Sequence, residues 1–319
     1  MIVLSETGGQ TCNHYWQYLY YLKDAIKNDT SFTVQLPDYT IEDYPNLLKS
    51  KYIKFPFYSS KLSRIIGVKK SIELTRKFTI LFLNNYSRMF LHYLSFKYLN
   101  FINGKPAWGL KNVQYSDIAS KLQYLFDLED SLKTPIDKAI MHGASRIVAE
   151  KNNHLIICGL HIRGGDYRKW KGGKYFFTQK TYREYCDSFL KLFPNNNVLF
   201  YIATNEPLDN EVFKDLNYVQ IKTASATQDL YGLSKCDYLI GTLSSYNSWV
   251  SLVWQKPLFT ITDTTIPQNV KKCDFAIVEN YHQKTNGWVF PRTEDFFLKQ
   301  RHPWLYKHSS SPEYRITEY

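Results

Sequence analysis

Apolar and polar positions alternate in blocks along the second half of the chain. Residues 155–162 (LIICGLHI) form an unbroken apolar run, which is typical of a strand buried on both faces of a parallel sheet. Residues 178–193 then show helical spacing and end at Pro194 and an Asn-rich turn. The alternation predicts further strands at 198–203, 218–222, 237–241 and 257–262, and further helices beginning near 207 and at 227–236 and 244–255.

Strands and helices that alternate at this spacing indicate an α/β fold, with a doubly wound parallel sheet covered by helices on both faces. The first half is mainly helical, with one short strand candidate at 2–4 before a Gly-Gly turn. Its expected helices lie at about 13–26, 71–99, 116–126 and 134–150. We therefore expect a helix-rich N-terminal domain over 1–152 and a second domain over 153–308, with the boundary within the polar linker 151–154, and a polar tail over 309–319.

Charge points to an anionic partner without selecting one. Lys and Arg outnumber Asp and Glu by 40 to 29, a net charge of +11, which suits a nucleotide diphosphate, an acidic glycan, an anionic membrane or nucleic acid. The basic residues are spread along the chain apart from 168–171 (RKWK), which disfavours nucleic acid and leaves a non-catalytic polyanion-binding protein as the weaker alternative. The aromatic content of 17% serves the core first and sugar-binding clefts second.

Several protein classes are disfavoured by what the chain lacks. Its five cysteines are scattered and include no C-x-x-C pair, so neither a zinc ribbon nor a disulfide framework is indicated. We see no signal peptide, and no apolar run reaches the ~18 residues of a transmembrane helix. We therefore expect a cytoplasmic protein that contacts the inner membrane at most peripherally. No D-x-D, H-E-x-x-H, G-x-G-x-x-G or P-loop pattern occurs, so we expect no metal and no cofactor.

Candidate chemistry gathers where two predicted strands end, and the first such place is 161–166 (HIRGGD). The fork of Arg163 can hold two phosphate oxygens at once, and the two glycines after it let a ligand approach the backbone. Asp166 could hold Arg163 in place or act on an acceptor hydroxyl. The alternative is a plain surface turn with an Arg–Asp pair.

The second place is 229–249 (DLYGLSKCDYLIGTLSSYNSW). A predicted strand ends at Gly241, and Thr242, Ser244 and Ser245 then lead into a helix. The N–H groups and hydroxyls at a helix N-terminus form an anion site. Simple N-capping is the alternative, because Ser and Thr are favoured caps.

Together these residues resemble a known family. The run H-I-R-G-G-D-Y resembles the H-x-R-x-G-D signature of the superfamily that joins α1,2-, α1,6- and protein-O-fucosyltransferases, and 229–245 is similar to the second donor-site motif of that superfamily. Weaker similarities are Gly8-Gly9 followed by Asn13, and the segment 201–206 (YIATNE). All four occur in the family's order.

The resemblance implies a GT-B architecture of two Rossmann-like domains, with the acceptor side in the first and the donor site in the second. It also implies an inverting, metal-independent transfer of fucose from GDP-fucose to a glycan such as a surface polysaccharide or lipopolysaccharide. Arg163 would offset the charge that builds on the GDP leaving group. Further donor contacts would come from Gly8, Gly9, Asn13, His161, Asp229, Thr242, Ser244 and Ser245. A different nucleotide sugar is the alternative donor.

The chain departs from the family pattern at two positions. Gly164 stands where many relatives have a second Arg, and 168–171 lacks the Glu that follows the motif in α1,6-type relatives. The catalytic base is therefore open between Asp166 and Glu6, which we expect to face the cleft from the first domain.

Overall fold

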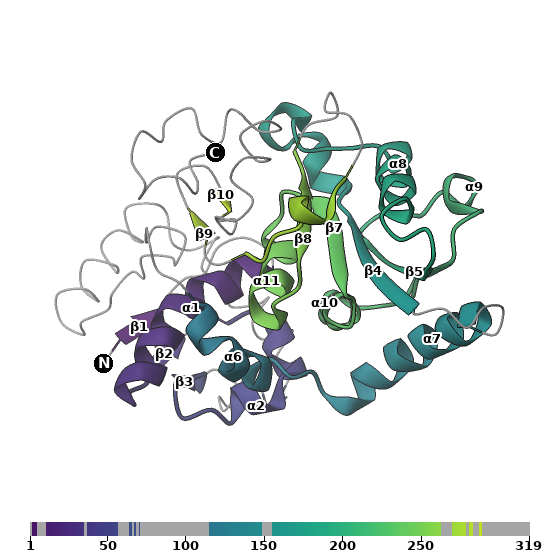
Figure 1. The fold of residues 1–319 in the computed structure, drawn as a ribbon. Helices are drawn as coiled ribbons and strands as arrows, with labels where there is room; N and C mark the ends of the chain where they lie inside the picture. The colour runs from purple at the N-terminus through teal and green to yellow at the C-terminus, as the bar shows by residue number, and fades with distance from the viewer. Residues whose placement is uncertain are drawn as a thin grey trace. The chain divides into compact units, whose positions relative to one another are not determined.

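The computed structural model describes residues 2–4, 11–34, 37–56, 64–65, 67, 70, 115–148, 155–262, 270–278, 281–282 and 287–288. The chain divides into two compact units. The first comprises Met1–Lys111 and Lys121–Asp127, and the second comprises Asn112–Ser120 and Leu128–Tyr319. Each unit contains its own parallel sheet, as Figure 1 shows.

The second unit is built on a five-stranded parallel sheet with the order β6-β5-β4-β7-β8. Its strands are β4 (Leu155–Ile162), β5 (Asn197–Thr204), β6 (Tyr218–Val219), β7 (Tyr238–Thr242) and β8 (Leu258–Ile261). The strand order reverses between β4 and β7, and a doubly wound fold binds its ligands at the carboxyl ends of the strands on either side of such a reversal. The predicted α/β fold with a doubly wound parallel sheet is thus confirmed.

Helices cover both faces of this sheet (Figure 1). They are α7 (Asp130–Val148), α8 (Gln179–Leu190), α9 (Asn210–Phe213), α10 (Ala226–Ser234) and α11 (Ser245–Trp254). One face of β4 packs with α8 into a core that includes Leu160, Tyr182 and Phe189. The other face is flat at Gly159, where a Cβ would come within 2.7 Å of Leu233 on α10. The glycine therefore lets that helix pack tightly against the sheet.

Helix α7 lies in the second unit, whereas we expected residues 130–148 in the first domain. The helix packs on β5, β6 and α10, and the second unit includes it together with Asn112–Ser120. A Cβ at Gly143 would lie 2.5 Å from Val219 of β6, and the Tyr231 hydroxyl of α10 donates to Asp137 over 3.0 Å. A polar segment in the sequence shows where two elements are connected. It does not show which unit the helix before it packs against, because that depends on the folded structure.

The first unit has a three-stranded parallel sheet, β1-β2-β3, and β2 and β3 were not predicted. Its elements are β1 (Ile2–Leu4), α1 (Thr11–Asn28), β2 (Phe32–Val34), η1 (Tyr39–Asp43), α2 (Pro45–Leu48) and β3 (Ile53–Lys54). Its core is aromatic: the ring centroid of Tyr15 lies 5.8 Å from that of Tyr44 and 5.0 Å from that of Phe126. All three rings are buried, so they are core residues rather than parts of a sugar-binding surface.

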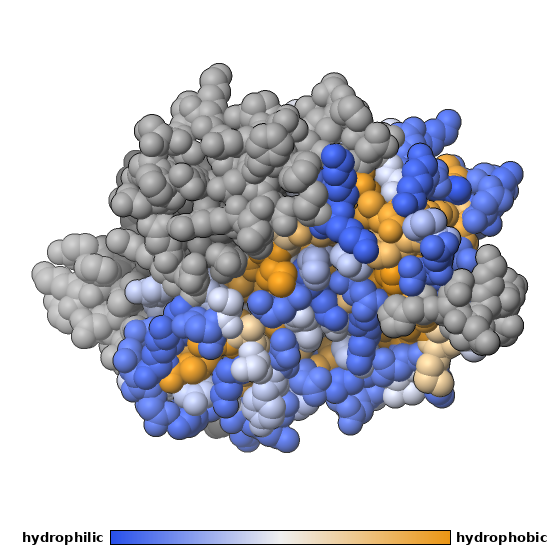
Figure 2. Space-filling view, in the orientation of Figure 1, coloured by the Kyte–Doolittle hydropathy of each residue, from blue (hydrophilic) through white to orange (hydrophobic). Residues whose placement is uncertain are grey.

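The remaining elements are short, apart from α6 (Ala119–Leu125), which follows η4 (Ser116–Ile118). The others are η5 (Gly165–Arg168), η6 (Trp170–Gly173), η7 (Lys272–Asp274), β9 (Tyr281–His282) and β10 (Gly287–Trp288). The helix predicted at 71–99 and the tail at 309–319 lie outside the described residues. On the face drawn in Figure 2, hydrophilic residues are interspersed with smaller apolar areas. Within the described ranges, no helix is long and apolar enough to cross a bilayer.

Candidate functional site

Arg163 is the first residue after β4 and lies where the strand order reverses. Its Nη2 atom is 2.9 Å from Oδ1 of Asp166, and its guanidinium lies 5.2 Å from the ring centroid of Tyr167. The Arg163 side chain is 14% exposed, whereas that of Asp166 is 51% exposed. The carboxylate and the ring hold the guanidinium in one orientation, so a rigid cation is placed at the ligand-binding edge of the sheet.

Gly164 follows Arg163 and lies against the carboxylate of Glu206. A Cβ at this position would lie 1.9 Å from Oε2 of Glu206, which follows β5. The Gly164 N–H also donates to Oδ1 of Asn205 over 2.8 Å. Glu206 in turn accepts a 2.8 Å ion-pair contact from Arg168. A side chain at position 164 would therefore require the Glu206 carboxylate to move, and that carboxylate is paired with Arg168 in this structure.

His161 is the last-but-one residue of β4 and is 5% exposed. Its ring stacks on that of Tyr246, with centroids 4.7 Å apart and an interplanar angle of 24°. Burial and then the positive charge of Arg163 lower the pKa of His161 to about 3, against a hydrogen bond with Asn247, so the imidazole is neutral at neutral pH. Its Nδ1 atom is buried and has no hydrogen-bond partner among the described residues, which makes it a candidate ligand contact.

A cavity of about 480 Å³ opens at the ends of β5 and β6, and Asn205, Glu206, Lys222 and Asp229 are among its lining residues. Asp229 lies in the first turn of α10 and accepts a 3.0 Å hydrogen bond from the Tyr201 hydroxyl. Burial raises the pKa of the Asp229 carboxyl to about 7, although the hydrogen bond from Tyr201 opposes the shift. This carboxyl therefore changes charge near neutral pH and is open to the cavity.

In the loop after β7, two hydroxyls that the sequence predicted as donor contacts form hydrogen bonds within the protein. Thr242 is fully buried, and its hydroxyl donates to the carbonyl of Tyr175 over 2.9 Å. Ser244 is the N-cap of α11, and its hydroxyl accepts the N–H of Tyr246 over 3.2 Å. The N-capping alternative thus holds for Ser244. Ser245 is the first residue of α11 and is half-buried.

The predicted contacts from the first unit are only partly described. Asn13 lies in α1 and is half-buried. Glu6, Gly8 and Gly9 lie outside the described residues, so their roles stay predictions. The choice of base between Glu6 and Asp166 also stays open.

Sequence reasoning assigned no role in the site to Tyr201, Asn205, Glu206 or Arg168. All but Arg168 belong to the segment 201–206, whose similarity to the family was noted without a role for its side chains. Ile162 of β4 pairs in register with Thr204 of β5, so the residues after both strands lie at the same edge. That adjacency of strands is the signal that would have identified them.

Metal-binding chemistry has no candidate in the described part of the chain, where no group of three or more His, Cys, Asp or Glu could hold an ion. The cysteines described there, Cys12, Cys158, Cys186 and Cys236, are buried and take part in no disulfide. Among the tryptophans proposed for stacking, Trp249 is fully buried, and Trp170 packs against Tyr167 with ring centroids 4.9 Å apart.

Comparison with known proteins finds similar structures and no match by sequence. No family model matches the chain, and no curated protein matches it. A crystal structure of POFUT1 in complex with GDP-fucose is similar at a TM-score of 0.47 and 10% identity, over 82% of this chain and 98% of that one. The fucosyltransferase NodZ from Bradyrhizobium is similar at 0.42 and 11%, over 83% and 95%. The wall teichoic acid polymerase TagF reaches 0.26 and 13%, over 81% and 69%. Likeness at this level carries no activity over to this chain, so its function rests on the residues of the site.

Proposed function

We propose that the chain is an inverting glycosyltransferase that binds GDP-fucose in its second unit and transfers fucose to a hydroxyl of a glycan. The observation that carries the proposal is the guanidinium of Arg163, held by Asp166 at the end of β4 where the strand order reverses. A fixed guanidinium at this edge of a doubly wound sheet suits the diphosphate of a nucleotide sugar. The order of the motifs from His161 to Ser245 supports fucose as the sugar.

Guanine recognition falls to Asp229 in this proposal. The Watson–Crick edge of guanine presents adjacent N–H donors, and an ionised carboxylate accepts both. Uracil offers one such donor, and adenine presents an acceptor at the corresponding ring nitrogen. A cavity of about 480 Å³ next to Asp229 is within the size range of small-molecule sites. The neutral His161 offers Nδ1 to the ribose or to a phosphate.

The reaction would proceed by a single displacement. The acceptor oxygen attacks C1 of fucose on the face opposite to GDP and forms the new glycosidic bond, while the bond from C1 to the β-phosphate oxygen breaks. The electron pair of that bond leaves with GDP, and N–H groups of Arg163 stabilise the added negative charge. The proton of the acceptor hydroxyl passes to a carboxylate, for which Asp166 and Glu6 are the candidates. Because Arg163 supplies the positive charge, this mechanism needs no metal ion.

The acceptor we propose is a surface polysaccharide or lipopolysaccharide precursor at the cytoplasmic face of the inner membrane. The net charge of +11 supports peripheral contact with an anionic membrane surface there. Transfer to membrane-extracted precursors, with fucose incorporation as the readout, tests this part separately from the donor.

The donor assignment is tested by calorimetric titration of GDP, GDP-fucose, UDP and ADP, with EDTA present, into the wild type, Arg163→Ala and Arg163→Lys. We expect GDP and GDP-fucose to bind the wild type selectively and Arg163→Ala to bind them about 100-fold more weakly. Arg163→Lys should recover only part of the affinity, because an ammonium lacks the planar fork.

Lys191→Ala is the matched control, since Lys191 is an exposed cation at the end of α8. Equal loss in Lys191→Ala would show that total charge rather than the site matters. Preference for UDP or ADP would assign another nucleotide sugar. If no nucleoside diphosphate binds to folded protein, the chain is not a transferase of this kind.

A further inference from the structure

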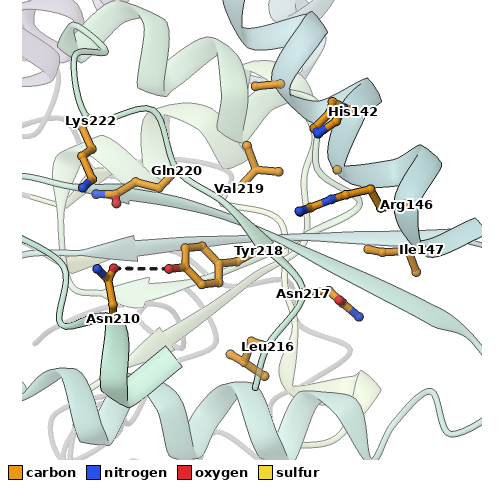
Figure 3. A pocket seen from close by; sticks show the side chains of 12 residues that line it. His142, Arg146, Ile147, Asn210, Leu216, Asn217, Tyr218, Val219, Gln220 and Lys222 are labelled. Carbon is orange, nitrogen blue, oxygen red and sulfur yellow. Dashed lines mark hydrogen bonds between the residues drawn. The ribbon is translucent and has the colours of Figure 1, made fainter. Parts of the chain in front are cut away.

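A second and larger cavity, of about 750 Å³, lies elsewhere in the same unit, between α7 and the segment 216–222 (Figure 3). Helix α7 contributes His142 and Arg146 to its wall. Gln220 and Lys222 line both this cavity and the one that contains Asp229, so the two cavities lie on either side of this short segment. None of the residues assigned to the donor lines the larger cavity.

The position of the cavity follows from the edge of the sheet. β6 is the edge strand and pairs with β5 over only Tyr218 and Val219. Helix α7 packs closely on this edge at Gly143, where a Cβ would lie 2.5 Å from Cγ2 of Val219. β6 is the last described strand on this side of the sheet, and the cavity lies between it and the helix.

The cavity is cationic and rich in amides. None of the twelve described residues that line it carries a carboxylate. The basic groups are Arg146, Lys222 and His142, and the amides are those of Asn210, Asn217 and Gln220. In Figure 3, Lys222 and Gln220 lie on one side of Val219, and Arg146 and His142 on the other.

Arg146 and Lys222 are exposed cations without a counter-ion in the described part of the chain. Among the described residues, neither Arg146 nor Lys222 takes part in an ion pair. Glu211 on the neighbouring α9 does not line the cavity and contacts Lys214 at 3.5 Å. Two uncompensated cations in one hollow create a positive potential that attracts an anion.

The amide side chains in the cavity can form hydrogen bonds with the hydroxyls of a sugar. The Tyr218 hydroxyl donates to Oδ1 of Asn210 over 3.4 Å, a bond that does not use the amide N–H groups of Asn210. Amide side chains both donate and accept, as the hydroxyls of a sugar require. The ring of Tyr218 adds an apolar face of the kind on which pyranose rings stack.

We propose that this cavity is a binding site for an anionic sugar, one that carries a phosphate or a carboxylate. Arg146 binds the oxyanion, Lys222 adds to the positive potential, and the amides of Asn217 and Gln220 bind ring hydroxyls. The volume is sufficient for one or two sugar rings. This site is independent of the proposed donor reaction.

The test is calorimetric titration of four compounds: glucose 6-phosphate, glucuronate, glucose and inorganic phosphate. The proteins are the wild type, Arg146→Ala and Asn217→Ala. Lys138→Ala is the matched control, because Lys138 is an exposed cation on the same helix and does not line the cavity. Thermal unfolding of each variant verifies that it is folded. Each titration is repeated with saturating GDP.

We expect at least one of the two charged sugars to bind, about tenfold more weakly in Arg146→Ala and unchanged in Lys138→Ala. Asn217→Ala should weaken the sugars and leave inorganic phosphate unaffected. Binding of glucose 6-phosphate alone would identify the oxyanion as a phosphate, and binding of glucuronate alone as a carboxylate. The proposal fails if neither binds, if inorganic phosphate binds as tightly as the sugars, or if Arg146→Ala has no effect. Displacement by GDP would also overturn it, because the sugar would then occupy the donor site.

Discussion

The loops that follow β4 and β7 flank the same reversal of strand order, and their polar groups are used differently. After β4, the guanidinium of Arg163 is bound to a half-exposed carboxylate and lies at the edge of the sheet. After β7, the hydroxyls of Thr242 and Ser244 are buried and bonded to their own chain. Both loops looked alike in sequence, as polar residues at strand ends with affinity for phosphate.

The two loops differ because the side chains of threonine and arginine differ in length and in the number of their hydrogen-bond donors. A threonine hydroxyl has one proton and a short side chain, so a bond to a single carbonyl such as that of Tyr175 uses its only donor. Hydroxyls near a helix start commonly satisfy local backbone in this way. An arginine has five N–H donors on a long stem, so it can contact Asp166 and still bind a ligand. A strand-end arginine is therefore a stronger indication of a ligand site than a strand-end hydroxyl.

The largest effect is expected at Arg163, on the ligand-binding side of this comparison. Arg163→Ala should lower the turnover of GDP-fucose about 100-fold, a loss of ~3 kcal/mol in transition-state stabilisation. Steady-state transfer to a glycan acceptor measures it. The free energy of unfolding should change little, because the side chain is bound to an exposed partner. If Arg163→Ala is destabilised and yet transfers fucose at the normal rate, Arg163 stabilises the fold and not the transition state.

Thr242 should behave in the opposite way. Thr242→Val leaves the buried carbonyl of Tyr175 without its donor, so the free energy of unfolding should fall by about 1–3 kcal/mol, while GDP affinity stays unchanged. Thr260→Val is the control, because the Thr260 hydroxyl is buried and has no hydrogen-bond partner among the described residues. Urea unfolding should find this control neutral or stabilised. Loss of GDP affinity in folded Thr242→Val would restore the donor role that the sequence predicted.

Asp229 offers a smaller and pH-dependent test. Its pKa is raised from 3.8 to about 7, so between these values the folded protein binds more protons than the unfolded chain. Stability from this group is therefore lost as pH rises through that window, by about 1–2 kcal/mol for a partly exposed group. The Asn side chain in Asp229→Asn does not titrate, so the free energy of unfolding of this variant should lack this part of the pH dependence.

Unfolding of the wild type and Asp229→Asn at pH 4 and pH 8 measures the effect. The variant should gain stability relative to the wild type at the higher pH. An equal difference between the two proteins at both pH values would mean that Asp229 keeps an ordinary pKa.

The smallest effect is expected at the N-cap of α11. Ser244→Ala removes the acceptor for the Tyr246 N–H and should cost about 1 kcal/mol of unfolding free energy, with GDP affinity retained. Ser145→Ala, at an exposed position inside α7, should change stability by a few tenths of a kcal/mol at most. Chemical unfolding compares the two. Reduced GDP affinity in Ser244→Ala would show that the cap and the ligand share this hydroxyl.

The sequence by itself determined where the strands of the second unit lie. The apolar run 155–162 coincides with β4, and the other four strands were each predicted to within a few residues. A strand buried on both faces is continuously apolar, which is a local property that can be seen without the fold. β2 and β3 have three and two residues, too few to show periodicity, and unlike the equally short β6 they do not stand in a regular alternation of strands and helices.

The tertiary structure alone decided which of the candidate residues contact one another. Gly164 and Arg168 contact Glu206, which follows β5, and Thr242 donates a hydrogen bond to Tyr175. Which segments become neighbours is set by strand order and by helix packing, and local patterns do not contain either. The sequence thus identified Arg163 as a cation at a strand end. Only the fold distinguished it from a hydroxyl whose hydrogen bonds were already made within the chain.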